Sequence, residues 1–224
     1  MAGWPRIGEN DAMKPSSAPA SAAAAQTVPL GILLAAGSGS RFAEAGGEGP
    51  KLLAPLTDGP ETGLPIAFVA ARRMRAALPR VVAVVREGDG ALADWLSRAG
   101  CDVFTSAECA RGMGASLAAA IRAFPSPSGW VVGLADMPSI APATIQQIAQ
   151  ACATEDAIVA PAFEGRRGHP VAFGAAHGPA LALLDGDIGA RTLVASYPVE
   201  VLNTRDGGVV RDIDRPRDLL KRSH

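Results

Sequence analysis

The feature that most restricts the fold is an alternation of short apolar runs with amphipathic segments, which starts at Pro29 and reaches Asn203. Short apolar runs predict buried strands, and apolar residues spaced three and four apart predict helices. Strands are predicted at Leu30–Ala36, Val81–Val85, Asp102–Phe104, Trp130–Ala135, Ala157–Pro161 and Val199–Asn203, and helices at Leu64–Leu78, Gly90–Ala99, Gly114–Phe124 and Pro142–Ala153. Strands separated by helices form mostly parallel sheets that are covered on both faces. We therefore predict a three-layer α/β fold with a mostly parallel sheet flanked by helices.

Two stretches depart from this alternation. Gly165–Phe173 interrupts it and predicts a small hairpin or an antiparallel edge. Residues 1–27 are rich in Ala, Pro and Ser and have no apolar period, so they bury too little surface to offset the entropy of ordering. They are predicted to be a flexible N-terminal extension, which leaves 28–224 as one domain.

Composition excludes several classes of protein. The formal charge is −1 and no basic run is longer than a pair, whereas a nucleic-acid-binding protein needs a broad basic face. The three cysteines are too few and too scattered for a disulfide framework or a metal knuckle. No apolar run has the length of a membrane span, and the first residues lack the pattern of a secretory signal. We expect a cytoplasmic protein with no nucleic-acid or membrane partner.

The most informative segment is a glycine-rich loop that directly follows the first predicted strand. It consists of Leu34, Ala35, Ala36, Gly37, Ser38, Gly39, Ser40 and Arg41. Open α/β sheets bind ligands at the carboxyl ends of their strands, and glycines let backbone amides approach an anion. Arg41 adds a forked cation suited to phosphate, and Lys51 supplies a second charge after a short link. The loop predicts a nucleoside triphosphate site.

Two better-known glycine loops fit less well. A P-loop needs Gly before its Lys and Ser or Thr after it, but Lys51 lies between Pro50 and Leu52. The dinucleotide fingerprint needs a third glycine where this chain has Phe42, and an acidic residue where the second strand ends in Arg86. A nicotinamide-dependent oxidoreductase is disfavoured, and the remaining alternative to a phosphate site is a plain turn between strand and helix.

Further motifs follow in a fixed order. They are Gly112-Met113-Gly114-Ala115-Ser116-Leu117, Ala135-Asp136-Met137-Pro138, Gly168-His169-Pro170, Gly186-Asp187-Ile188-Gly189-Ala190-Arg191 and Asp212-Ile213-Asp214-Arg215-Pro216. Together with the loop and Lys51-Leu52, this series resembles the molybdenum cofactor cytidylyltransferases, which have a MobA-like nucleotidyltransferase domain. The resemblance covers about Leu30 to Leu219 and implies a Rossmann-like nucleotidyltransferase fold. The chain departs from the family in its long Phe42–Pro50 link and in Thr105, where many relatives have Asn.

The resemblance also implies an activity. Ala35-Ala36 looks like the cytidylyl branch, so the nucleotide would be CTP and the acceptor a molybdenum–molybdopterin cofactor. Mg²⁺ would be the cofactor, and a client molybdenum oxidoreductase would be a further partner. Nucleotide contacts would come from Leu34 to Arg41 and Lys51, with Arg41, Lys51 and Asp136 as the catalytic residues.

Two carboxylates are candidate metal ligands. Asp136 ends an apolar strand, where a carboxylate can hold Mg²⁺ together with waters and phosphates. Asp214 follows Asp212 by two residues, so both would share a face if that segment is extended. Each also fits a helix N-cap, Asp136 ahead of a helix over Pro138–Ile148 and Asp214 at the start of the last helix.

The candidate acceptor-binding residues are Gly112, Met113, Gly114, Ser116, His169 and Pro170. The first four form a turn entering a helix, whose N–H groups can bind an anion, although plain helix–sheet packing explains small residues nearly as well. A lone histidine is more often structural than functional, so a binding role for His169 is implied by the resemblance alone. Asp187 and Arg191 fit an ordinary turn with an ion pair, or substrate contacts.

The predicted function is transfer of CMP from CTP to the terminal phosphate of the molybdopterin-type cofactor, with release of pyrophosphate. Such a phosphate is already ionised, which agrees with a chain of three histidines and no Ser/His/Asp arrangement. One alternative is a nucleotidyltransferase that acts on a sugar phosphate or another small phosphate. The other is a non-catalytic protein that carries the cofactor as a chaperone.

Overall fold

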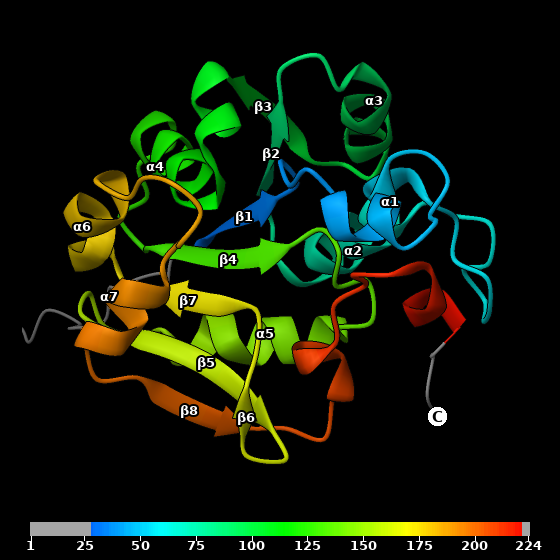
Figure 1. The fold of residues 1–224 in the computed structure, drawn as a ribbon. Helices are drawn as coiled ribbons and strands as arrows, with labels where there is room; N and C mark the ends of the chain where they lie inside the picture. The colour runs from blue at the N-terminus through cyan, green and yellow to red at the C-terminus, as the bar shows by residue number, and fades with distance from the viewer. Residues whose placement is uncertain (1–27, 221–224) are drawn as a thin grey trace, which may run out of the picture.

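The computed structural model describes residues 28–220, so the predicted N-terminal extension lies outside the described residues. The core of the molecule is an eight-stranded sheet in which the order is β3-β2-β1-β4-β7-β5-β6, with β8 paired to β5 (Figure 1). The strands are β1 (Leu30–Leu34), β2 (Val81–Arg86), β3 (Asp102–Ser106), β4 (Trp130–Leu134), β5 (Ile158–Phe163), β6 (Arg166–Arg167), β7 (Val171–Phe173) and β8 (Glu200–Asn203). All six predicted strands are present, with bounds shifted by a few residues.

The first half of the sheet is parallel, as predicted. β1 pairs with β2 on one side and with β4 on the other, with Leu33 opposite Ala83 and Gly133. β1 is therefore where the chain reverses its direction of travel across the sheet, and ligands bind outside the carboxyl ends of strands at such a point.

The segment Gly165–Phe173 was predicted to form a small hairpin or an antiparallel edge, and it contains elements of both. β6 makes a short hairpin with β5, and β7 is antiparallel. However, β7 does not lie at an edge, because it is inserted between β4 and β5 and pairs with both. Its three residues, Val171–Phe173, are all buried, which suits a central strand.

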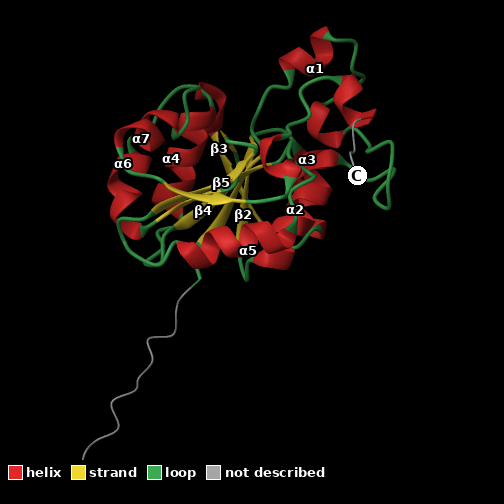
Figure 2. Ribbon diagram, turned by 90° about the horizontal axis from the view of Figure 1, so that it is seen from below, coloured by secondary structure: helices red, strands yellow, loops and turns green. Residues whose placement is uncertain are grey.

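Helices cover both faces of the sheet. They are α1 (Ser40–Glu44), α2 (Ile66–Ala77), α3 (Gly90–Arg98), α4 (Met113–Ala123), α5 (Pro142–Ala151), α6 (Gly178–Ala182) and α7 (Arg191–Ser196). Figure 2 shows α2 and α5 on one face and α4, α6 and α7 on the other. The three-layer α/β fold is therefore confirmed.

Each layer has its own apolar core, and the alternation of side chains along the strands separates the two. Leu33 and Val85 face α2 and α5, whereas Ile32 and Val84 face α4 and α6. A third cluster lies beyond the carboxyl ends of the strands, where Phe42 of α1 packs with Ile213 and other residues. Only the first three residues of the long Phe42–Pro50 link belong to α1, and the rest form a turn in which Gly47 lies against the ring of Phe42.

The N-terminus of α5 is capped from a distant part of the chain. Its N-cap residue Ala141 has no side chain able to accept a hydrogen bond, and Asp206 takes that role. One carboxylate oxygen of Asp206 accepts hydrogen bonds from the amide of Ala141 and the hydroxyl of Thr144, each 2.8 Å long. The segment that follows β8 is thereby fastened across the end of the sheet. None of the helices between residues 28 and 220 has both the length and the apolar character needed to span a bilayer.

Candidate active site

A cleft of about 600 Å³ opens at the carboxyl ends of β1, β2 and β4. Its size is that of a pocket for a small molecule or cofactor. Residues from across the chain line it: Leu34, Ala36, Gly37, Ser38, Gly39, Ser40, Arg41, Phe42, Lys51, Leu52, Arg86, Ala110, Gly112, Met113, Ser116, Leu134, Asp136, Asp187, Asp212 and Asp214. The glycine-rich loop, both predicted cations and both predicted metal ligands are therefore brought to one cavity.

The loop that follows β1 is exposed to the cleft along most of its length. Gly37, Ser38, Ser40 and Arg41 are exposed, whereas Ala35 is buried and points away from the cavity. Gly39 has φ of +66°, and a Cβ there would lie 3.0 Å from the Cβ of Lys51. Glycine at this position thus permits both the left-handed backbone and the close approach of Lys51.

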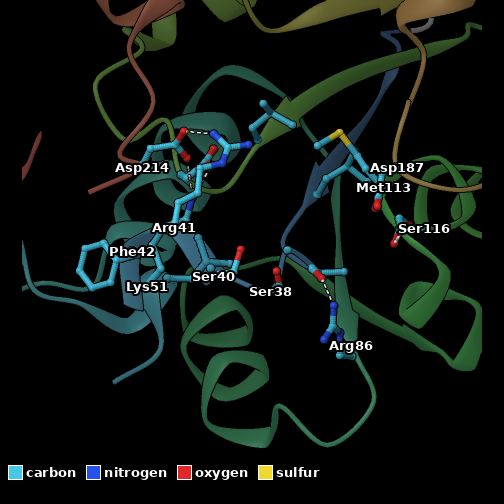
Figure 3. Close-up of a pocket in the computed structure, with 18 of the residues that line it drawn as sticks. Ser38, Ser40, Arg41, Phe42, Lys51, Arg86, Met113, Ser116, Asp187 and Asp214 are labelled. Atoms are coloured by element: carbon cyan, nitrogen blue, oxygen red, sulfur yellow. Dashed lines mark hydrogen bonds and ion pairs between the residues drawn. The ribbon is translucent and has the colours of Figure 1, made fainter. Parts of the chain in front are cut away.

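Lys51 bridges the two candidate metal ligands. Its Nζ lies 2.8 Å from Oδ2 of Asp136 and 3.4 Å from Oδ1 of Asp214. The guanidinium of Arg41 donates to the other carboxylate oxygen of Asp214 (Figure 3). An alternating chain of two cations and two carboxylates thus lies along one side of the cleft, with Lys51 largely shielded from solvent.

The carboxylates fit a metal that uses few protein ligands. Oδ1 of Asp136 is buried and has no hydrogen-bond partner within residues 28–220. A buried carboxylate oxygen without a donor is costly unless a cation meets it. In the described part of the chain, no three His, Cys, Asp or Glu side chains cluster tightly enough to chelate an ion on their own. Asp136 and Asp214 could hold a divalent cation that takes its other ligands from waters and substrate phosphates.

The capping alternatives for these two aspartates are not observed. Asp136 lies five residues before Ala141, the N-cap of α5, whose amide is bound by Asp206. At the last turn Asp218 accepts from the amides of Asp214 and Arg215, while the carboxylate of Asp214 faces Lys51. Both side chains are therefore available to the cleft.

Opposite the cations, the turn that starts α4 packs against the loop before α7. The amide of Gly114 donates to the carbonyl of Gly186 over 2.7 Å, and the hydroxyl of Ser116 donates to the carbonyl of Gly112 over 2.8 Å. Gly112 has φ of +121°, and a Cβ on it would lie 2.2 Å from Oδ1 of Asp187. Met113 and Asp187 line the cleft here, while Gly114 is buried behind it. Within residues 28–220 no ion pair joins Asp187 to Arg191.

The Gly168-His169-Pro170 motif lies behind the cleft and does not line it. Pro170 borders a minor void on the far side of β4, together with Met74. Burial lowers the pKa of His169, and the carboxylates of Asp136 and Asp212 act in the opposite direction. Nδ1 of His169 is buried without a hydrogen-bond partner among the described residues. The geometry thus gives His169 a place beside Asp136 instead of a direct place in the cavity.

Sequence reasoning missed Arg86 as a site residue. Arg86 is the last residue of β2 and lines the cleft, where its Nη2 donates to the carbonyl of Ala36 over 3.0 Å. The available signal was a single charge at the end of the otherwise apolar run Val81–Val85. Asp212 was noted only as a companion of Asp214, and it also lines the cleft.

Comparison with known proteins identifies the family. Residues 31–201 match the family model described as MobA-like NTP transferase domain. No curated protein matches the chain.

Several solved structures share the fold. The crystal structure of Rv0371c from Mycobacterium tuberculosis H37Rv is 31% identical, with a TM-score of 0.72, and the match covers 87% of this chain and 96% of that one. A structure of Rv0371c in complex with manganese is 30% identical, with a TM-score of 0.68, over 88% of this chain and 100% of that one. A nucleotidyl transferase from Methanothermobacter thermautotroptrophicus, at 24% identity and a TM-score of 0.72 over 87% and 95% of the two chains, supports the fold alone. From the family match and these relatives together, the chain belongs to the MobA-like NTP transferase domain family.

Proposed function

We propose that this nucleotidyltransferase moves CMP from CTP to the terminal phosphate of a molybdopterin-type cofactor and releases pyrophosphate. The observation that carries the proposal is the chain of Arg41, Asp214, Lys51 and Asp136 along the glycine-rich loop. It combines two cations for a triphosphate with two carboxylates for a divalent ion. CTP and the acceptor are supported by the resemblance in the motifs, and the divalent ion by the manganese complex of a 30% identical relative.

In the proposed reaction an oxygen of the acceptor phosphate attacks the α-phosphorus of CTP in line. A new oxygen–phosphorus bond forms, the bond between the α-phosphorus and its bridging oxygen breaks, and that electron pair leaves with pyrophosphate. An ionised phosphate needs no strong general base, so the protein contributes mainly position and charge. Arg41, Lys51 and the amides of the loop bind the β- and γ-phosphates and stabilise the negative charge of the leaving group.

Asp136 and Asp214 would hold Mg²⁺, which when bound supplies charge neutralisation at the transferring phosphoryl group. Without substrate, Lys51 pairs with both carboxylates, and Arg41 supplies the second positive charge through its contact with Asp214. With a divalent cation and a triphosphate bound, Asp136 and Asp214 would hold the cation, and the ammonium group of Lys51 would be available to the phosphates. Gly112, Met113, Gly114 and Ser116 face or support the side on which the acceptor would bind, with His169 and Pro170 behind Asp136.

The test is pyrophosphate release from CTP, GTP, UTP and ATP with Mg²⁺, each with and without purified molybdopterin cofactor. We expect release from CTP that requires the cofactor. Release from CTP that does not need the cofactor, or no cofactor-dependent release from any nucleotide, would contradict the proposal.

A further inference from the structure

Arg86 is a third cation in the cleft, and the proposed phosphate chemistry does not use it. Its Nη2 is held by the carbonyl of Ala36 at 3.0 Å, while its Nε is buried and has no hydrogen-bond partner within residues 28–220. The structure forms no ion pair between Arg86 and a carboxylate of the described chain, unlike Arg41 and Lys51. A guanidinium is always charged and carries five donors, so it needs acceptors when a ligand excludes water from the cleft.

The position of Arg86 separates it from the phosphate-binding side. Figure 3 shows Arg86 on the opposite side of Ser38 from Arg41, Lys51 and Asp214. A triphosphate held by Arg41 and Lys51 therefore directs its nucleoside towards the other end of the cleft, where Arg86 lies.

At that end of the cleft Arg86 is the cation, and the carboxylate of Asp187 lines the same cavity. The carbonyl of Ala36 already accepts a hydrogen bond from Arg86, and the carbonyl of Leu34 accepts one from the amide of Ala135. The hydroxyl of Ser116 donates to the carbonyl of Gly112, so its oxygen is left as an acceptor in the cleft. A base that binds against Arg86 has to present acceptors to the guanidinium, whose Nε has no hydrogen-bond partner among the described residues.

Among the four common bases, cytosine alone has two adjacent acceptors, N3 and O2, on its Watson–Crick edge. Uracil has an N–H between its two oxygens, adenine has one acceptor beside an amino group, and guanine has one acceptor beside two donors. A forked guanidinium binds an adjacent pair of acceptors well. We propose that Arg86 determines base specificity by donating to N3 and O2 of cytosine, while the carbonyl of Ala36 orients its side chain. This inference rests on the proposed function and names the residue that selects the nucleotide.

The experiment measures binding, so it does not depend on the acceptor. Full-length wild type, Arg86→Met and Arg86→Lys are titrated calorimetrically with CTP, UTP, GTP, ATP and inorganic tripolyphosphate in the presence of Mg²⁺. Arg80→Met is the matched control, because Arg80 precedes the same strand, is exposed and pairs with Asp102 outside the cleft. Thermal unfolding of every variant checks its fold.

We expect Arg86→Met to lower the affinity for CTP by about 10- to 100-fold, which is the range for a bidentate contact with a base. Tripolyphosphate affinity should stay within about twofold, and GTP should change little. Arg86→Lys keeps the positive charge but loses the forked donor geometry of the guanidinium. It should therefore retain the affinity for tripolyphosphate and lose most of the preference for CTP. Should Arg86→Met not fold, Arg86→Lys alone makes the same distinction.

Two outcomes overturn base reading while the proposed function stands. In one, the variants keep the wild-type ratio of CTP to GTP affinity. In the other, the affinities for tripolyphosphate and for every nucleotide fall by the same factor, which would make Arg86 a phosphate contact. A wild type that prefers GTP would instead indicate the O6 and N7 acceptors of guanine and would refute the choice of cytosine. Wild type that binds no nucleotide at all would refute the proposed function, and the inference with it.

Discussion

The backbone amide of Ile213 donates a hydrogen bond of 3.0 Å to the carbonyl oxygen of Asp136. This bond ties the segment that carries Asp214 to the end of β4, so two carboxylates from distant parts of the sequence are held on either side of Lys51. Because this bond joins backbone atoms, it does not depend on either carboxylate side chain.

Asp136→Ala should reduce pyrophosphate release by about 100-fold or more, because it removes the carboxylate with an unpaired buried oxygen. Steady-state assays at saturating Mg²⁺ measure the effect. Asp94→Ala is the control, since Asp94 is exposed on α3. Near-normal turnover of Asp136→Ala would show that this carboxylate is not a metal ligand.

Lys51→Ala should lower the rate by about 100-fold while the fold is retained. The loss leaves Asp136 and Asp214 without their shared cation, so the cleft repels a triphosphate more strongly and KM should rise as well. Lys51→Arg keeps a charge and should recover part of the activity. Kinetics combined with far-UV circular dichroism test this prediction, which an unchanged rate in Lys51→Ala would contradict.

Gly112→Ala should destabilise the protein by about 1–3 kcal/mol and impair catalysis, because its Cβ would lie 2.2 Å from Oδ1 of Asp187 and 2.6 Å from the carbonyl carbon of Gly186. Urea unfolding measures the change in the free energy of unfolding. Gly90→Ala is the matched control, since a Cβ there meets nothing within 4 Å. Equal stability of the two variants would mean that the loop yields without cost.

Asp206→Ala should cost about 1–3 kcal/mol of unfolding free energy, because the amide of Ala141 and the hydroxyl of Thr144 lose their acceptor. Asp89→Ala serves as the control, because Asp89 is at the N-cap of α3 and makes no capping bond. The control should change stability by less than about 0.5 kcal/mol. Thermal or urea unfolding of both variants decides whether the distant cap matters.

The buried thiols predict a pH dependence of stability. Burial raises the pKa of Cys101 to about 12 and that of Cys152 to about 11, from an ordinary value of 9.0. The unfolded chain therefore loses these protons first, so the two thiols contribute stability that is complete below pH 9 and declines as the pH rises to about 11 for Cys152 and about 12 for Cys101. Unfolding free energies at pH 8 and 10 for wild type and Cys101→Ala/Cys152→Ala should show a steeper fall in wild type. An equal fall in unfolding free energy from pH 8 to pH 10 in both proteins would refute the predicted contribution of the thiols.

The sequence predicted the parallel half of the sheet well, because strands such as Val81–Arg86 are buried on both faces and read as continuous apolar runs. It could not place β7, since a strand of three residues carries no period and its neighbours are decided by tertiary packing. The loop and the two cations were evident from residue type. The direction of the Arg86 side chain was not, because its contact with Ala36 joins residues 50 apart in the chain. The distant cap from Asp206 was hidden for the same reason.

The contact between Arg41 and Asp214 joins positions 173 residues apart. A ribosome therefore completes the nucleotide loop early and the opposing carboxylate late. Until Asp214 emerges, the nascent chain exposes Arg41 without this counter-charge and without the segment that covers Phe42. Under the proposed function, a fragment that ends before Asp214 would carry the glycine-rich loop and Arg41 but lack both this carboxylate and Ile213, which packs against Phe42.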